Sequence, residues 1–340
     1  FVSNIAQFNK LKNIIKDKKF IKKIFSFEKL PNVEFEYINL EDLIKNNNKK
    51  NLSIRKSLAL RKDPSCIIYT SGTQGNPKGV ILSHGGILNN CEGAIDILKP
   101  LLTKQQPRFL TWLPLSHSYE HTVQFVQILI GAKIFYAESL EKLLTNMSEA
   151  KPTIMTAVPR FYQNLFNKIN INFSKQRGFK KKLIDFTIAL GTKKLKKIKL
   201  NYYEILIDFI CDVLVRKKVK KQFGGNLQAF VSGGGALDKK IGEFLNSIGL
   251  PTLQGYGLTE ASPVVSCNIP DQIQVETVGP PFRTNSVKIA KDGEILIKGE
   301  NVMLGYWNKK KETDEIIKDG WLYTGDIGEI NRAGNLKITD

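Results

Sequence analysis

A loop rich in glycine and hydroxyl side chains near residue 75 has the composition of a polyphosphate-binding site. It follows a short apolar run, residues 66–69, which predicts a buried strand. Glycine permits positive φ and close approach of the backbone to an anion, hydroxyls donate to phosphate oxygens, and lysine supplies charge. The residues assigned to phosphate binding are Thr70, Ser71, Gly72, Thr73, Gln74, Gly75 and Lys78.

The spacing of this loop differs from that of the Walker loop, where Gly-Lys-Ser/Thr stands directly before a helix. Here Pro77 precedes Lys78 and Gly79 follows it. Taken alone, the loop is also compatible with a glycine-rich turn in an α/β protein. The rest of the chain is needed to choose between the two interpretations.

Five segments of the chain resemble, in the same order, motifs of the adenylate-forming (AMP-binding) superfamily, whose members activate a carboxylic acid with ATP. They comprise residues 69–79, 113–120, 232–237, 254–260 and 321–326. Within the superfamily, the resemblance is strongest to long-chain acyl-CoA synthetases. It covers nearly all of the chain.

This resemblance implies a ligase that converts a long-chain fatty acid to an acyl-adenylate and then transfers the acyl group to CoA. AMP and diphosphate are released, and ATP, Mg²⁺ and CoA are required. Two alternatives stay open: a fatty acyl-AMP ligase that loads a carrier protein, and a non-catalytic homologue that binds nucleotide or lipid.

The resemblance also assigns roles to residues near the phosphates. It makes Glu260 the Mg²⁺ ligand, a hard oxygen donor of the kind that this ion uses together with substrate phosphates. Thr259 is expected to contact the α-phosphate. His117 is expected to position the acyl substrate without transferring a proton, although a lone histidine is more often structural. In the loop, Gln74 replaces a threonine that is usual in the family and still donates a hydrogen bond.

Other residues are assigned to the nucleoside. Tyr256 offers a ring on which adenine can stack, and Asp326 offers a carboxylate to the ribose hydroxyls. The segment Gly233, Gly234, Gly235 and Ala236 is expected to line the adenine and acyl sites. Without the family, Gly255, Tyr256 and Gly257 form only a turn, and Asp326 is an aspartate in a type I turn.

Composition narrows the class of protein. The formal net charge is +19, but only eight of the 51 basic residues are arginine, the side chain best suited to nucleic-acid recognition, so no nucleic-acid partner is expected. Four widely spaced cysteines fit reduced thiols, and no apolar run reaches the ~20 residues that a membrane span requires. We therefore expect a cytoplasmic protein.

The elements that must position these residues alternate between helix and strand, which predicts an α/β fold with mostly parallel sheets covered by helices. Helices are expected at residues 84–98, 119–130, 140–149, 160–169 and 239–247, and strands at 109–113, 133–136, 153–157, 229–232 and 251–255. From about Val264 short strands and turns predict a small β-rich subdomain, with strands at 286–289, 294–298 and 328–330 and a hairpin at Asp292-Gly293.

We predict three parts: a partial α/β subdomain (1–62), an ATP-binding α/β subdomain (63–263) and the β-rich subdomain (264–340). The resemblance places a hinge at residues 336–340, a C-terminal domain with a catalytic lysine beyond it, and a further segment before Phe1. It therefore implies that the 340-residue chain alone adenylates poorly.

A basic helical segment at residues 170–222 interrupts the central part. Within it, residues 203–215 are amphipathic, with an acidic stripe formed by Glu204, Asp208 and Asp212. The favoured interpretation is a pair of surface helices with solvated lysines. The alternative is peripheral contact with an anionic membrane.

Overall fold

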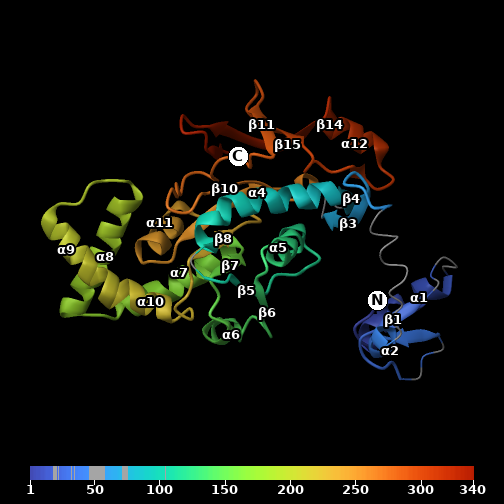
Figure 1. Ribbon diagram of the computed structural model, residues 1–340, viewed down its shortest axis with the longest axis horizontal. Helices are drawn as coiled ribbons and strands as arrows, with labels where there is room; N and C mark the ends of the chain where they lie inside the picture. Colours follow the sequence, from blue (N-terminus) through green and yellow to red (C-terminus); the bar gives the residue numbers. More distant parts are fainter. Residues whose placement is uncertain are drawn as a thin grey trace. The chain divides into compact units, whose positions relative to one another are not determined.

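The computed structural model describes residues 1–17, 21, 23–31, 33, 35–45, 58–70, 76–103 and 105–340 (Figure 1). Its contacts divide the chain into two compact units, Phe1–Ala59 and Leu60–Asp340. The predicted division of the second unit near residue 263 remains a prediction. No helix in the described ranges is both long enough and apolar enough to cross a membrane.

The first unit is a small α/β element. It contains α1 (Ile5–Asp17), β1 (Ile24–Ser26), β2 (Tyr37–Asn39) and α2 (Leu40–Lys45), and the two strands are parallel. The Asn4 side chain caps α1 by accepting a hydrogen bond from the Gln7 amide at 3.1 Å. Val2, Phe8, Ile24 and Leu30 form its core.

The second unit is built on a six-stranded sheet in the order β10-β9-β8-β7-β5-β6. The strands are β5 (Arg108–Thr111), β6 (Lys133–Tyr136), β7 (Ile154–Ala157), β8 (Ala229–Ser232), β9 (Thr252–Gly257) and β10 (Val264–Cys267). All pairs are parallel except β9–β10. The five parallel strands were predicted, with bounds within two residues, and the α/β fold is confirmed.

Helices cover this sheet because successive strand residues are buried on opposite faces. Leu110, Met155 and Phe230 pack in one cluster, whereas their neighbours Phe109, Ile154 and Ala229 pack in another. The helices are α4 (His84–Leu102), α5 (Ser118–Leu129), α6 (Leu143–Ala150), α7 (Pro159–Ser174), α8 (Gly178–Leu195), α9 (Tyr202–Cys211), α10 (Lys217–Lys221) and α11 (Lys239–Ser247), with a π-helix at Asp212–Arg216. Figure 1 shows α8, α9 and α10 at the end of this unit farthest from β3 and β4.

The run at residues 66–69 is a strand but is not buried, which corrects the prediction. It lies in β3 (Pro64–Thr70), the edge strand of a three-stranded sheet with β4 (Lys78–Ser83) and β13 (Gly305–Tyr306). Only Ile68 is buried, because it faces Val80 and Leu82 while Ile67 and Tyr69 point to the open side. The β3–β4 hairpin is antiparallel.

The C-terminal part is β-rich, as predicted, and forms a curled antiparallel sheet. Its elements are β11 (Asn285–Ile289), β12 (Glu294–Gly299), α12 (Lys310–Ile316), β14 (Ile317–Lys318), β15 (Trp321–Ile330) and β16 (Leu336–Ile338). The expected hairpin joins β11 to β12, with Gly293 at φ 91°. However, residues 264–267, which fall in the range predicted for this β-rich part, form β10 and pair with β9. The turn at residues 258–263 returns the chain directly along that strand.

Candidate functional site

The motif at residues 254–260 occupies the end of β9 and the short 3-10 helix η2 (Thr259–Ala261). Gly257 is required at the bend because a Cβ there would collide with the Pro263 backbone. Buried side-chain amides hold the turn: Asn90 and Asn301 both donate to the Ala261 carbonyl oxygen at 3.3 Å. The backbone that carries Thr259 and Glu260 is therefore fixed by its surroundings.

Glu260 and Lys78 meet at a shared tyrosine. The Tyr306 hydroxyl donates to Glu260 Oε1 at 2.7 Å, and Lys78 Nζ lies 4.9 Å from the centroid of the Tyr306 ring. Burial, followed by the hydrogen bond to Glu260, raises the pKa of Tyr306 well above its usual range, so the hydroxyl keeps its proton and donates. The predicted metal ligand and the predicted phosphate-binding lysine thus lie on one side of the molecule.

Tyr306 is held there by the β3–β4 hairpin. It pairs with Val80 of β4, and the Trp307 amide donates to the Gly79 carbonyl oxygen at 2.7 Å. Thr70 and Lys78 face each other where the hairpin leaves the sheet. The other assigned loop residues, Ser71, Gly72, Thr73, Gln74 and Gly75, lie outside the described residues.

The start of α5 approaches Thr259. The Ser118 and Thr259 hydroxyl oxygens are 2.9 Å apart, within hydrogen-bond distance, and His117 is the N-cap residue of α5. His117 Nδ1 accepts from the Tyr119 amide at 3.3 Å, and its ring is exposed. Nδ1 is therefore committed to the helix, and Nε2 is the nitrogen left for a substrate.

Glu120 lies behind this turn and is fully buried. Its Oε2 accepts from the Thr156 hydroxyl at 2.8 Å, while Oε1 has no hydrogen-bond partner among the described residues. Burial raises the pKa of Glu120 to about 7. It does not cap the helix, and its location under the strand ends makes it part of the support for the site.

The glycine segment after β8 serves a second purpose. A Cβ on Gly233 would lie 2.8 Å from the Tyr119 ring, and the Tyr119 hydroxyl donates to the Val231 carbonyl oxygen at 3.0 Å. Gly233 is thus needed for packing as much as for any ligand. Gly234, Gly235 and Ala236 are exposed beyond it.

A second acid–tyrosine pair lies between the parallel sheet and the curled sheet. The Tyr256 hydroxyl donates to Asp326 Oδ2 at 2.5 Å. Burial, and then this bond, raise the pKa of Tyr256. The Asp326 amide in turn donates to the Thr324 hydroxyl oxygen at 3.1 Å, which fixes the aspartate at the bend after Gly325.

The structure thus joins Lys78 to Glu260 through Tyr306, His117 and Ser118 to Thr259, and Tyr256 to Asp326. The glycine segment follows β8 and the 254–260 motif ends the adjacent parallel strand β9, at the carboxyl ends where ligands bind in open α/β sheets. Tyr306 and Ser118 were not identified from the sequence. Ser118 lies inside the 113–120 motif, whereas Tyr306 lies in a two-residue strand whose local sequence shows no recognisable pattern.

The donor set suits a metal ion that is held mainly by phosphate. No cluster of three or more His, Cys, Asp or Glu side chains occurs among the described residues. Glu260 Oε1 is occupied by Tyr306, which leaves Oε2 for a cation. One carboxylate plus substrate phosphates is the usual protein share of a Mg²⁺ site.

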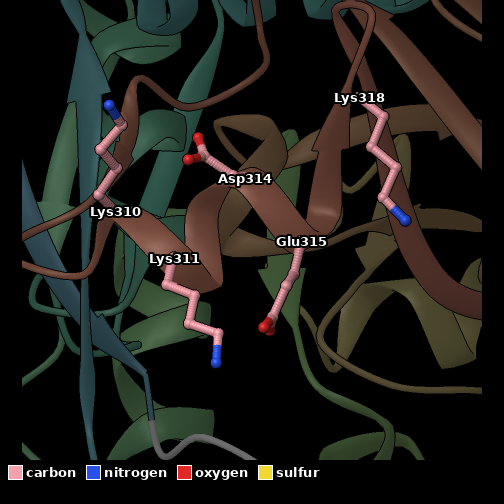
Figure 2. Close-up of a pocket in the computed structure, with 5 residues that line it drawn as sticks. All are labelled: Lys310, Lys311, Asp314, Glu315 and Lys318. Atoms are coloured by element: carbon pink, nitrogen blue, oxygen red, sulfur yellow. The ribbon is translucent and has the colours of Figure 1, made fainter.

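Two surface cavities lie away from these residues. One, of about 620 Å³, is lined by charged residues of α12 and β14 (Figure 2). Figure 2 shows the Lys310 and Asp314 side chains pointing one way and those of Lys311 and Glu315 the other, so the charges do not converge on a ligand. The other cavity, of about 460 Å³, lies beside Arg216, whose guanidinium is already bonded to Asp208 and backbone carbonyls.

Comparison with known proteins agrees with these motifs. The sequence profile described as AMP-binding enzyme matches residues 6–307. A long-chain-fatty-acid–CoA ligase, FadD15, of Mycobacterium bovis is 33% identical over 297 residues, which are 85% of this chain and 48% of that protein. Long chain acyl-CoA synthetase 3 of Arabidopsis thaliana is 32% identical over 97% of this chain and 53% of its own length.

Solved structures share the fold at lower identity. O-succinylbenzoate CoA synthetase (MenE) of Bacillus subtilis with its acyl-adenylate intermediate has a TM-score of 0.64 at 19% identity, over 98% of this chain and 60% of that one. The N-terminal domain of FACL13 from Mycobacterium tuberculosis has a TM-score of 0.62 at 18% identity, over 100% of this chain and 73% of that one. The chain spans about half the length of the curated relatives it matches.

Proposed function

We propose that this chain, which belongs to the AMP-binding enzyme family, holds the ATP-binding part of a ligase that activates long-chain fatty acids. The complete protein joins a fatty acid to AMP with loss of diphosphate, and then transfers the acyl group to the thiol of CoA with release of AMP. ATP, Mg²⁺ and CoA are its co-substrates and cofactor. This proposal covers the whole protein, of which the chain matches about half.

The observation that carries the proposal is the meeting of Lys78 and Glu260 at Tyr306. A triphosphate bound along the 70–78 loop places its oxygens beside a carboxylate that can share a Mg²⁺ ion. Such an ion would neutralise charge on the phosphoryl oxygens during attack by the carboxylate of the fatty acid. Thr259, fixed by Ser118, supplies a hydroxyl for the α-phosphate.

The nucleoside is proposed to bind next to the second acid–tyrosine pair. Asp326 accepts hydrogen bonds from the ribose hydroxyls, and the Tyr256 ring stacks against adenine with Gly255 and Gly257 beside it. The segment at residues 233–236, exposed from Gly234 onward, is proposed to face the adenine and the acyl group. His117 is proposed to position the acyl carboxylate through Nε2. Because backbone and tyrosine contacts already hold these groups, binding requires little rearrangement.

The acid that is activated is inferred from the curated relatives, which are named as long-chain-fatty-acid–CoA ligases or long chain acyl-CoA synthetases at 32–33% identity. This chain shares its fold with a CoA synthetase for o-succinylbenzoate, so the fold alone does not select the acid. We propose a cytoplasmic location from the four free cysteines.

The test is acyl-CoA formation by the complete protein with saturated acids of increasing length. Acetate, an aryl acid and an amino acid serve as comparisons. Highest kcat/KM for a long-chain fatty acid, with one diphosphate released per acyl-CoA formed, supports the proposal. Preference for one of the comparison acids overturns the substrate class. Acyl-adenylate formation that proceeds without acyl transfer to CoA points instead to a ligase that loads a carrier protein.

A further inference from the structure

The sides of helix α9 that face the protein and the solvent are the reverse of those in an ordinary surface helix. Its acidic stripe faces the protein: Glu204 pairs with Lys193 of α8, and Asp208 pairs with Lys194 at 2.9 Å and with Arg216 at 2.6 Å. These bonds commit the polar side of the helix to α8 and to the π-helix. A surface helix normally turns its apolar side inward and its polar side to water.

The apolar side of α9 is left in solvent. Its members, which we call the α9 face, recur every three or four residues and therefore lie on one side of the helical run. They are Tyr202, Ile205, Leu206, Phe209, Ile210 and Val213. Tyr202 is 91% exposed, Phe209 66% and Leu206 61%. Such a continuous row of large exposed apolar side chains indicates a surface that meets another apolar phase.

The surroundings of the α9 face are basic. Residues 170–222 contain fifteen Lys and Arg against four acidic residues. Three of those acids, Asp185, Glu204 and Asp208, are already paired with basic side chains. Lys217 and Lys218 are exposed where α10 continues the same helical run, and Figure 1 shows α8, α9 and α10 together at one end of the unit.

We propose that the α9 face docks on an anionic lipid membrane, with its aromatic and aliphatic side chains in the interfacial region and the lysines against the lipid phosphates. Apolar residues flanked by lysine, on a helix that lies flat, are the features of an interfacial amphipathic helix. Anionic headgroups attract such lysines. The proposal does not depend on which acid the protein activates.

Charge selects the membrane over a second copy of the chain. In a two-fold dimer through the α9 face, the same basic surroundings would oppose each other, and like charges at an interface disfavour association. A surface rich in anionic lipid has the complementary charge and is also apolar beneath its headgroups.

The experiment is sedimentation of the complete protein with vesicles of phosphatidylcholine, either pure or containing about a third of phosphatidylglycerol. We expect at least tenfold tighter binding to the anionic vesicles at low salt, and loss of that preference in 0.5 M salt. The double variant Leu206→Ser, Phe209→Ser should bind at least tenfold more weakly. The matched control, Ile128→Ser with Leu140→Ser, changes two side chains of similar exposure on other elements and should bind as wild type.

Two further measurements separate insertion from simple charge attraction. Lys217→Glu with Lys218→Glu should weaken binding, whereas Lys310→Glu with Lys311→Glu on α12 should not. The fluorescence of the tryptophan introduced by Phe209→Trp should be quenched by brominated lipid in anionic vesicles. The fluorescence of the tryptophan introduced by Leu140→Trp should not be quenched.

Equal binding to neutral and anionic vesicles, or unchanged binding by the Leu206/Phe209 variant, would overturn the proposal. Sedimentation velocity that shows a dimer, lost in the same variant, would overturn it in favour of a second copy. Retention of anionic-vesicle binding with no quenching at position 209 would also overturn it, because the face would not then enter the lipid.

Discussion

The proposed phosphate end and the proposed nucleoside end of the candidate site share one arrangement, a carboxylate that accepts a hydrogen bond from a tyrosine hydroxyl. At the phosphate end Tyr306 donates to Glu260, and at the nucleoside end Tyr256 donates to Asp326. In both tyrosines, burial and the acidic acceptor raise the pKa. Each acid is thus oriented before any ligand binds.

The two ends differ in what the tyrosine connects. Tyr306 belongs to a strand paired with β4, so it ties Glu260 to the hairpin that ends in Lys78. Tyr256 lies at the end of the parallel sheet, whereas Asp326 lies on β15 of the curled sheet. The proposed phosphate end is therefore set by strand pairing within one small sheet, and the proposed nucleoside end depends on how two sheets are held together.

The largest expected effect is at the phosphate end. Glu260→Gln keeps an oxygen that can accept from Tyr306 but removes the charge that holds Mg²⁺. We expect ATP–diphosphate exchange by the complete protein to fall about 100-fold or more, because metal charge stabilisation supplies several kcal/mol. The control variant Glu315→Gln, on the exposed helix α12, should show ATP–diphosphate exchange at the wild-type rate. Exchange within twofold of wild type in Glu260→Gln would show that Glu260 does not hold the metal ion. Absence of exchange in the wild-type protein itself would indicate a non-catalytic homologue.

A smaller effect, of a different kind, is expected at the nucleoside end. Asp326→Asn weakens hydrogen bonds to the ribose, and bonds to a charged group contribute about 1.5–3 kcal/mol, or roughly 10- to 100-fold. The KM for ATP should rise by this factor, and kcat should stay nearly unchanged. Asp314→Asn is the control. A fall in kcat with unchanged KM would mean that the two ends do not divide binding and chemistry as proposed.

The acids of both ends could be selected from the sequence, but the tyrosine that holds Glu260 could not. Glu260 and Asp326 stand in runs whose spacing is recognisable along the chain. Tyr306 pairs with Val80, more than 200 residues earlier, through a strand of two residues. Such a long-range contact leaves no periodicity in the local sequence.

The same limit explains two other outcomes. The apolar run at residues 66–69 is equally compatible with a buried parallel strand and with a half-exposed hairpin strand, since neighbours in space decide burial. The period of residues 203–215 predicted an amphipathic helix, but only ion pairs with α8 decide that its acidic side faces inward. By contrast, the central parallel strands β7 and β8 were predictable because burial on both faces favours apolar side chains at successive positions.

The tyrosine hydroxyls provide a direct comparison of the two ends. Tyr306→Phe keeps the ring beneath Lys78 and removes the donor to Glu260, so the Mg²⁺ concentration for half-maximal exchange should rise about tenfold. Tyr256→Phe should leave that concentration unchanged and alter only the KM for ATP. Titration of exchange activity with Mg²⁺ measures both. An equal Mg²⁺ shift in the two variants would show that the ends are not independent.

The smallest effect is expected at Ser118, which reaches Thr259 between the two ends. Ser118→Ala removes one neutral hydrogen bond, which contributes about 0.5–1.5 kcal/mol, and water can replace part of it at the half-buried Thr259. We expect a fall of about two- to fivefold in the rate of acyl-adenylate formation in single-turnover experiments, with the Kd for ATP unchanged. Ser174→Ala, at an exposed helix end, is the control. A change in ATP affinity without a change in rate would place Thr259 with the nucleoside end, because it would then act in binding and not at the phosphorus that reacts.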